Sequence, residues 1–137
     1  MPEVADLAAI HAVCFTLPRP WSAAEITSLL GSPHVFLLAE SNGFLLGRAV
    51  AGEAELLTLA VLPVARGQGI GARLIQDFLT EAKARAATTA FLEVAAGNDP
   101  AIRLYERAGF VLNGRRKAYY ASLDGHRDDA LVLSRAL

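Results

Sequence analysis

Glu55-Leu-Leu-Thr-Leu-Ala-Val-Leu-Pro-Val-Ala-Arg-Gly-Gln-Gly-Ile-Gly-Ala-Arg-Leu-Ile-Gln-Asp-Phe-Leu79 is the stretch of sequence that decides the fold. Its first part, Glu55 to Val61, is rich in leucine and valine and holds no residue that breaks a strand. Pro63 lacks the N–H group that a sheet ladder requires, so the strand should end before it. From Ile70 to Leu79 the apolar residues recur at helical spacing. The stretch therefore predicts a buried strand, a tight turn and a helix.

Three glycines alternate in the turn of this stretch: Gly67, Gly69 and Gly71. Backbone without Cβ atoms lets a ligand approach closely and lets several amide N–H groups point into one concavity. The helix that follows adds its unpaired N–H groups and the positive end of its dipole. The pattern predicts a phosphate-binding loop at the helix N-terminus.

Two other interpretations of the glycine-rich turn fit the sequence less well. A plain connection without a ligand would not need three glycines within five residues. A dinucleotide-binding fingerprint formally fits Gly67-x-Gly69-x-x-Ala72, but residues 63–66 separate the strand from the first glycine. A chain of 137 residues is also too short for both nucleotide-binding halves. Both alternatives therefore fit less well than a loop that binds a phosphate-containing ligand.

Composition narrows the class of protein. The length of 137 residues predicts a single domain spanning 1–137, and the apolar fraction of 53% is enough for one core. A formal charge of -1 does not favour nucleic acid as a partner, and no apolar run is long enough for a membrane span. The N-terminus lacks the basic region of a secretion signal. Cys14 is the only cysteine and the three histidines are scattered, so no disulfide and no metal are expected. These features predict a soluble cytoplasmic domain.

The order of elements predicts an α/β fold with a mixed, mostly antiparallel sheet flanked by helices. Helices are expected over 4–15, 22–30, 70–87 and 101–108, and strands over 35–40, 44–51, 55–61, 89–95, 110–119 and 129–134. Ser22 and Glu25 form a capping box at the start of the second helix. The strand 89–95 follows a helix, so we expect it to lie parallel to 55–61.

Four side chains outside the turn invite a functional interpretation. His11 and Cys14 share the apolar side of the first helix, where we interpret them as core residues. Glu93 lies within an apolar strand, where a carboxylate is costly unless it is paired. It is therefore either a structural ion-pair member or a catalytic base, and the sequence alone does not choose. Tyr105, taken alone, is expected to be a packing residue.

Two motifs in the expected order resemble the GNAT acetyltransferase superfamily. Arg66-Gly-Gln-Gly-Ile-Gly71 fits its Arg/Gln-x-x-Gly-x-Gly/Ala signature, and the stretch from Leu92 to Phe110 is similar to L-x-V-x-x-x-N-x-x-A-x-x-L-Y-x-x-x-G-F. The likeness runs from about Leu7 to the end and is closer to the RimI type, the bacterial ribosomal-protein-alanine N-acetyltransferases. The matching segments are Pro20-Trp-Ser22, Leu92-Glu-Val94, Asn98, Leu104-Tyr-Glu106, Arg116-x-x-Tyr-Tyr120 and Asp124-Gly125.

One departure from the family concerns the N-terminus. The RimI type usually opens with a strand before the first helix, and Met1 to Glu3 leave no room for it. Either that strand is dispensable or the start is placed too late. We expect the sheet edge at residues 35–40 to be exposed, which leaves open whether the protein is a monomer or a weak dimer.

The resemblance implies acetyl transfer from acetyl-CoA to a protein N-terminal α-amine, with the N-terminal alanine of a ribosomal protein as the acceptor. Alternatives are a small-molecule amine or a lysine side chain as acceptor, or a non-catalytic sensor of acetyl-CoA. In this resemblance Glu93 matches the general base, acting directly or through a water, and Tyr105 matches the general acid. The residues implied to bind the cofactor are Leu59, Ala60, Val61, Arg66, Gly67, Gln68, Gly69, Ile70, Gly71, Ala72 and Asn98.

The sequence says less about which residues bind the acceptor. Trp21, Tyr119 and Tyr120 either line a peptide groove or serve as a hydrophobic staple and ordinary sheet residues. We interpret the basic group 115–117 as a solvated strand face.

Overall fold

The computed structural model describes residues 3–15, 19–121, 125 and 127–137. Its helices are α1 (Val4–Cys14), α2 (Ala23–Leu30), α3 (Ile70–Ala84) and α4 (Asp99–Arg107), with a short 3-10 turn, η1, at Pro63–Ala65. The strands are β1 (Val35–Glu40), β2 (Gly43–Val50), β3 (Glu53–Val61), β4 (Thr89–Ala95), β5 (Val111–Ala121) and β6 (Arg127–Ala136). The expected helices and strands are present, with ends shifted by a few residues. Of the segment Asp124-Gly125, which resembles the RimI type, only Gly125 lies within the described residues.

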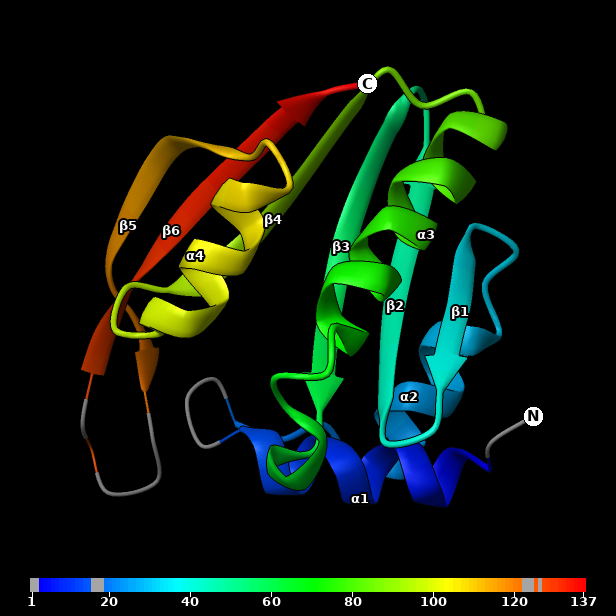
Figure 1. Ribbon diagram of the computed structural model, residues 1–137, viewed down its shortest axis with the longest axis vertical. Coiled ribbons are helices and arrows are strands. Elements are labelled where there is room, and N and C mark those ends of the chain that lie inside the picture. The colour runs from blue at the N-terminus through cyan, green and yellow to red at the C-terminus, as the bar shows by residue number, and fades with distance from the viewer. Residues whose placement is uncertain (1–2, 16–18, 122–124, 126) are drawn as a thin grey trace.

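The strands form one six-stranded sheet in the order β1-β2-β3-β4-β6-β5 (Figure 1). All neighbouring pairs are antiparallel except β3 and β4, which are parallel as the intervening helix predicts. The mixed, mostly antiparallel sheet is therefore confirmed. In the described part of the chain β1 pairs with β2 alone, so β1 forms one edge of the sheet, as expected.

Helices cover both faces of the sheet. Figure 1 shows α3 and α4 side by side over one face, with α1 and α2 packed on the other near the end of β3. The larger core lies under α3 and α4, and Phe78, Ile75 and Leu92 are fully buried in it. The smaller core, around Leu7 and Phe44, lies under α1 and α2. Within the described ranges no helix has the length and apolar character to cross a bilayer.

An irregularity in β3 changes which residues face each core. Gly47 of β2 pairs with Leu56, whereas the preceding Leu46 pairs with Thr58, so Leu57 is an extra residue in β3. Such a bulge reverses the alternation of side chains along the strand. Leu56 accordingly faces the α3 core, whereas Ala60 faces the α1 and α2 core.

The two central strands separate at the level of this bulge. The β3–β4 ladder runs from the pair Glu53 and Thr89 to the pair Leu56 and Leu92, and stops there. Beyond it the two strands diverge toward the end of the sheet where α3 begins (Figure 1). The candidate site lies beyond the bulge, between the diverging ends of β3 and β4.

Candidate active site

The diverging part of β3 turns backbone polar groups toward β4. Leu62 N–H donates to the carbonyl oxygen of Asn42 at 2.8 Å. This bond shows which residues of β3 direct their backbone groups toward β2. Residues in an antiparallel ladder alternate between hydrogen-bonding to the neighbour and facing away from it. The N–H and C=O groups of Leu59 and Val61 therefore point away from β2. Ala60, also expected to bind the cofactor, has the opposite phase and pairs with β2.

The backbone of β4 lines the opposite side of the space between the strands. Ala96 N–H donates to the carbonyl oxygen of Asp129 at 2.9 Å, so the backbone groups of Glu93 and Ala95 point away from β6 and toward β3. No ladder joins the described segments 57–61 and 93–95. A ligand that carries amide groups can complete both strands across this space, because buried backbone groups require partners.

The glycine-rich loop lies at the open end of this space. Gly67 and Gly69 adopt left-handed backbone, with φ of 84° and 81°. A Cβ atom on Gly67 would meet no atom within 4 Å, so the Cβ side of this residue faces open space. Gly69 is the N-cap of α3 and has no side chain with which to cap it. The first N–H groups of α3 thus have no side-chain cap, and such groups suit an anion.

Arg73 braces the loop, and sequence reasoning did not single it out. Its Nη1 atom donates to the carbonyl oxygen of Gln68 at 3.1 Å, while Nη2 bonds Oε1 of Glu40 at 2.7 Å. The Arg73 side chain therefore ties the loop to the end of β1. Arg66, at the start of the loop, donates from Nε to the carbonyl oxygen of Val61 at 3.1 Å. Both contacts occupy carbonyl oxygens and leave the loop amides free to face a ligand.

Gly71 serves a different purpose from the other two glycines. It lies inside α3, where a Cβ atom would come within 2.9 Å of Cδ2 of Leu104 on α4. Its small size allows α3 and α4 to approach each other. Ala72 lines a hollow of about 150 Å³ between these helices, together with Leu104 and Arg107. Ile70 is buried in the α3 core and anchors the start of the helix.

Asn98 caps α4 at the end of β4. Its side-chain oxygen accepts a hydrogen bond from Ala101 N–H at 3.3 Å, and its own N–H donates to the carbonyl oxygen of Ala95 at 2.9 Å. Pro100 occupies the first turn of the helix, where a missing N–H group costs nothing. The capping geometry holds Asn98 beside the diverging end of β4.

Glu93 lies on β4, one residue beyond the last residue that pairs with β3. Its side chain is 24% exposed and forms an ion pair with Arg116, with Oε1 3.3 Å from Nη2. The first of the two alternatives left open by the sequence, an ion pair, is therefore present. The carboxylate also retains solvent access beside the space between the strands, which a base requires.

Tyr105 is buried on α4 and meets the ring of Phe110 edge to face, with centroids 6.1 Å apart. Burial raises the pKa of the Tyr105 hydroxyl, and the nearby Tyr120 adds to the increase. Tyr105 is therefore protonated at neutral pH and able to donate. The pKa of Tyr120 rises to about 12, first through burial and then through the charge of Glu93.

Tyr119 and Tyr120 lie together on β5, with ring centroids 5.2 Å apart. Tyr119 is 52% exposed, and the guanidinium carbon of Arg116 lies 5.1 Å from its ring centroid. The basic group 115–117 is exposed, as expected, but two of its members have carboxylate partners: Arg116 pairs with Glu93 and Arg115 with Asp129.

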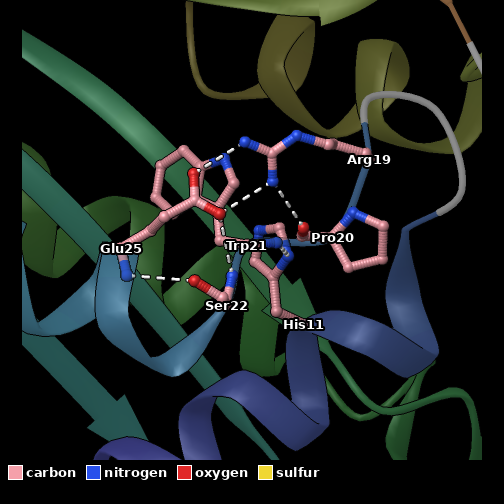
Figure 2. A network of polar contacts seen from close by, with 6 residues as sticks. All are labelled: His11, Arg19, Pro20, Trp21, Ser22 and Glu25. Atoms are coloured by element: carbon pink, nitrogen blue, oxygen red, sulfur yellow. Dashed lines mark hydrogen bonds and ion pairs between the residues drawn. The ribbon is translucent and has the colours of Figure 1, made fainter.

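Trp21 packs against the smaller core. The Trp21 ring stacks on that of His11, with centroids 5.1 Å apart, and the backbone N–H of Trp21 donates to Nδ1 of His11 at 3.0 Å (Figure 2). The other ring nitrogen of His11, Nε2, carries the proton and contacts Oγ1 of Thr58 at 2.9 Å. Burial lowers the pKa of His11 to about 4, although Glu25 opposes the shift. His11 is a core residue, as expected, and Trp21 is a packing residue with a partly exposed ring.

The segment that follows Trp21 begins α2 with the predicted capping box. Ser22 Oγ accepts from Glu25 N–H at 3.1 Å, and Oε1 of Glu25 accepts from Ser22 N–H at 3.1 Å. Figure 2 shows Arg19 reaching the same carboxylate, with Nη1 2.7 Å from Oε1. The capping box is confirmed.

Comparison with known proteins decides the family, because residues 4–110 match the acetyltransferase (GNAT) family. The chain belongs to the GNAT family. The ribosomal protein bS18-alanine N-acetyltransferase of Escherichia coli K12 is 35% identical over 137 residues, covering 96% of this chain and 92% of the relative. N-alpha-acetyltransferase RimI of Mycobacterium tuberculosis H37Rv is 36% identical over 122 residues, covering 82% of this chain and 75% of the relative.

Solved structures agree with this GNAT assignment. The crystal structure of the ribosomal-protein-S18-alanine N-acetyltransferase from Escherichia coli matches with a TM-score of 0.85 and 30% identity, over 97% of this chain and 86% of that chain. The resemblance to the GNAT superfamily and to its RimI type is confirmed, as is the GNAT fold. So is the enzyme class, an acetyl-CoA-dependent N-acetyltransferase.

Proposed function

We propose that this chain transfers the acetyl group of acetyl-CoA to the α-amine of a protein N-terminus. The N-terminal alanine of ribosomal protein bS18 is the proposed acceptor, since the Escherichia coli relative is named for it. The observation that carries the proposal is the divergence of β3 and β4 beyond Leu56 and Leu92, with Glu93 at the fork. The glycine-rich loop stands at the open end of the same space.

The residues present fit acetyl-CoA. The N–H and C=O groups of Leu59 and the N–H groups of Val61 and Ala95 offer strand edges to the amides of the pantetheine arm, while the carbonyl oxygens of Val61 and Ala95 already accept from Arg66 and Asn98. The left-handed Gly67 and Gly69, followed by α3, offer unpaired N–H groups to the diphosphate. The cofactor supplies a thioester, from which an amine can take the acetyl group.

Glu93 would supply the base that frees the acceptor amine. Only a neutral amine attacks a thioester, and an α-amine has a reference pKa of about 7.8 against about 10.4 for lysine. The neutral form of lysine is therefore roughly 400-fold scarcer at neutral pH, so an α-amine needs less assistance. Glu93 would take the proton directly or through a water.

Tyr105 would supply the acid. As the new carbon–nitrogen bond forms and the carbon–sulfur bond breaks, the Tyr105 hydroxyl would pass its proton to the departing thiolate. Because burial raises the pKa of Tyr105, a lasting phenolate is unfavourable there. Solvent therefore has to return a proton to Tyr105 during or just after the transfer, while Glu93 releases its own.

Release of free thiol from acetyl-CoA, measured with several acceptors, tests the proposal. Turnover with a peptide that begins with the alanine of bS18 supports it. Turnover with small amines or lysine alone would assign the chain to another acceptor class. Tight binding of acetyl-CoA without turnover on any acceptor would indicate a sensor and contradict the proposal.

A further inference from the structure

An irregular segment in β5 stands beside the candidate site. In the β5–β6 ladder Arg116 pairs with Ala130 and Tyr120 pairs with Asp128, so the three residues 117–119 face Asp129 alone. At the centre of the segment Ala118 adopts left-handed backbone, with a φ of 49°. Left-handed backbone is unfavourable for alanine, so the surrounding contacts must hold this bulge in place.

At the bulge, side chains of β6 form hydrogen bonds to the β5 backbone in place of the regular ladder. Oδ1 of Asp129 accepts a hydrogen bond from Ala118 N–H at 2.8 Å, and Oδ2 accepts one from Nη1 of Arg115 at 2.6 Å. The carbonyl oxygen of Ala118 accepts from Nη1 of Arg127 at 3.3 Å. The Ala118 hydrogen bond, followed by that from Arg115, lowers the pKa of Asp129, so the carboxylate is ionised at neutral pH.

The bulge determines where the β5 side chains point. In a regular strand Tyr119 and Tyr120 would lie on opposite faces of the sheet. Here their rings meet edge to face, 5.2 Å apart, and Arg116 lies over Tyr119 while pairing with Glu93. The irregular backbone thus gathers two aromatic rings and a cation on the side of the sheet where Glu93 stands.

The same β6 segment also holds the turn that follows β4. Oδ2 of Asp128 accepts from Gly97 N–H at 2.8 Å, and the carbonyl oxygen of Asp129 accepts from Ala96 N–H at 2.9 Å. Asp128 further accepts from Asp129 N–H through Oδ1 at 2.8 Å. Residues 128 and 129 therefore connect the tyrosine bulge to the β4 end of the site.

We propose that Asp129 is a positioning residue for acceptor recognition, holding the β5 bulge so that Tyr119 and Tyr120 form one wall for a protein N-terminus. This inference rests on the proposed function. The ammonium group of a protein N-terminus is bonded to the α-carbon, and a small side chain on that carbon leaves the group open to contact. Two adjacent aromatic rings suit such a group, because they offer apolar surface and a cation–π face together.

Three variants test this role: Asp129→Ala, Asp129→Asn and, as a matched control, Arg115→Gln. Asp129→Ala removes both contacts of the carboxylate, whereas Asp129→Asn keeps an oxygen that can accept from Ala118 N–H. Arg115→Gln removes the ion pair and leaves the contact with Ala118 intact. For each variant kcat and KM for an alanine-starting peptide, the Kd for acetyl-CoA and the exchange rate of the Ala118 amide are measured.

We expect Asp129→Ala to raise the peptide KM about tenfold, to leave the Kd for acetyl-CoA within about twofold, and to speed exchange at Ala118. Asp129→Asn should recover most of the loss, and Arg115→Gln should change KM less than about threefold. An unchanged KM in Asp129→Ala would overturn the proposal. So would a parallel loss of acetyl-CoA affinity, which would indicate a general structural role.

Failure of the proposed function has a different signature. If the wild-type protein acetylates small amines but no peptide, the acceptor assignment fails before any variant is made. The exchange rate of the Ala118 amide does not depend on the acceptor, so it reports separately whether Asp129 holds the bulge. If Asp129→Ala were to unfold, the Asp129→Asn variant would provide the same comparison. The proposal ties the peptide KM to the bulge, so in that variant a raised KM with unchanged exchange at Ala118, or faster exchange with an unchanged KM, would contradict it.

Discussion

Nη2 of Arg116 lies 3.3 Å from Oε1 of Glu93, so the proposed base has a cation beside it before any acceptor arrives. The ammonium group of a protein N-terminus carries the same charge and would approach the same carboxylate. Arg116 also stacks on Tyr119, which gives its side chain a second contact on the acceptor side. The acceptor ammonium and the guanidinium of Arg116 would therefore contact the same carboxylate. This makes Glu93 the first residue to test.

Replacement of Glu93 by glutamine should lower kcat at least about 100-fold, because it removes the proton acceptor and keeps the shape of the side chain. The Kd for acetyl-CoA, measured by calorimetry, should stay within about twofold. Glu55→Gln is the matched control, since Glu55 also pairs with an arginine, with Oε1 2.7 Å from Nη2 of Arg48. Equal loss in both variants would show that the effect belongs to surface charge and not to catalysis.

Tyr105→Phe should lower turnover at least about tenfold while leaving acetyl-CoA binding nearly unchanged. The substituted ring keeps its contact with Phe110, so the midpoint of thermal unfolding should move little. Thiol release and a thermal scan on the same preparation separate the two effects. Full activity in this variant would remove Tyr105 from the chemistry.

Gly69→Asp should weaken acetyl-CoA binding at least about 100-fold, because the new carboxylate stands where the diphosphate is proposed to bind. Gly69 has a φ of 81°, so any side chain there also adds backbone strain. Gly52→Asp carries the same strain, since Gly52 has a φ of 84° in the turn between β2 and β3. Only the first variant should lose binding in a calorimetric titration. Normal affinity in Gly69→Asp would disprove the phosphate-binding loop.

The buried His11 should make stability depend on pH. Its pKa falls from the ordinary 6.5 to about 4 in the folded protein, so the unfolded chain binds the proton first as the solution is acidified. Full stability is expected above pH 6.5, and it should decline by about 3 kcal/mol as the pH falls to about 4. Urea unfolding at a series of pH values measures the decline.

His11→Phe keeps a ring between Phe15 and Trp21 but cannot titrate, so it should flatten the pH dependence assigned to His11. It also leaves the backbone N–H of Trp21 without its acceptor, and we expect lower stability at pH 7 by about 1–3 kcal/mol. His34→Gln, at an exposed position, is the control and should retain the wild-type profile. An unchanged slope in His11→Phe would assign the pH dependence to other groups.

Local patterns in the sequence were sufficient to predict the elements and the parallel placement of β4. The capping box at Ser22, the Pro63 stop and the spacing of apolar residues in α3 each depend on neighbours along the chain. The same is true of the left-handed glycines that precede α3. Such features are local, so the sequence displays them directly.

The tertiary structure alone decided the roles that depend on distant partners. The bulge at Leu57, the pairing of Arg116 with Glu93 and the contact of Gly71 with Leu104 each join segments far apart in the sequence. Whether a glycine meets a ligand or a helix depends on what the fold packs against it. Strand register and packing follow from the whole core, and no local pattern encodes them.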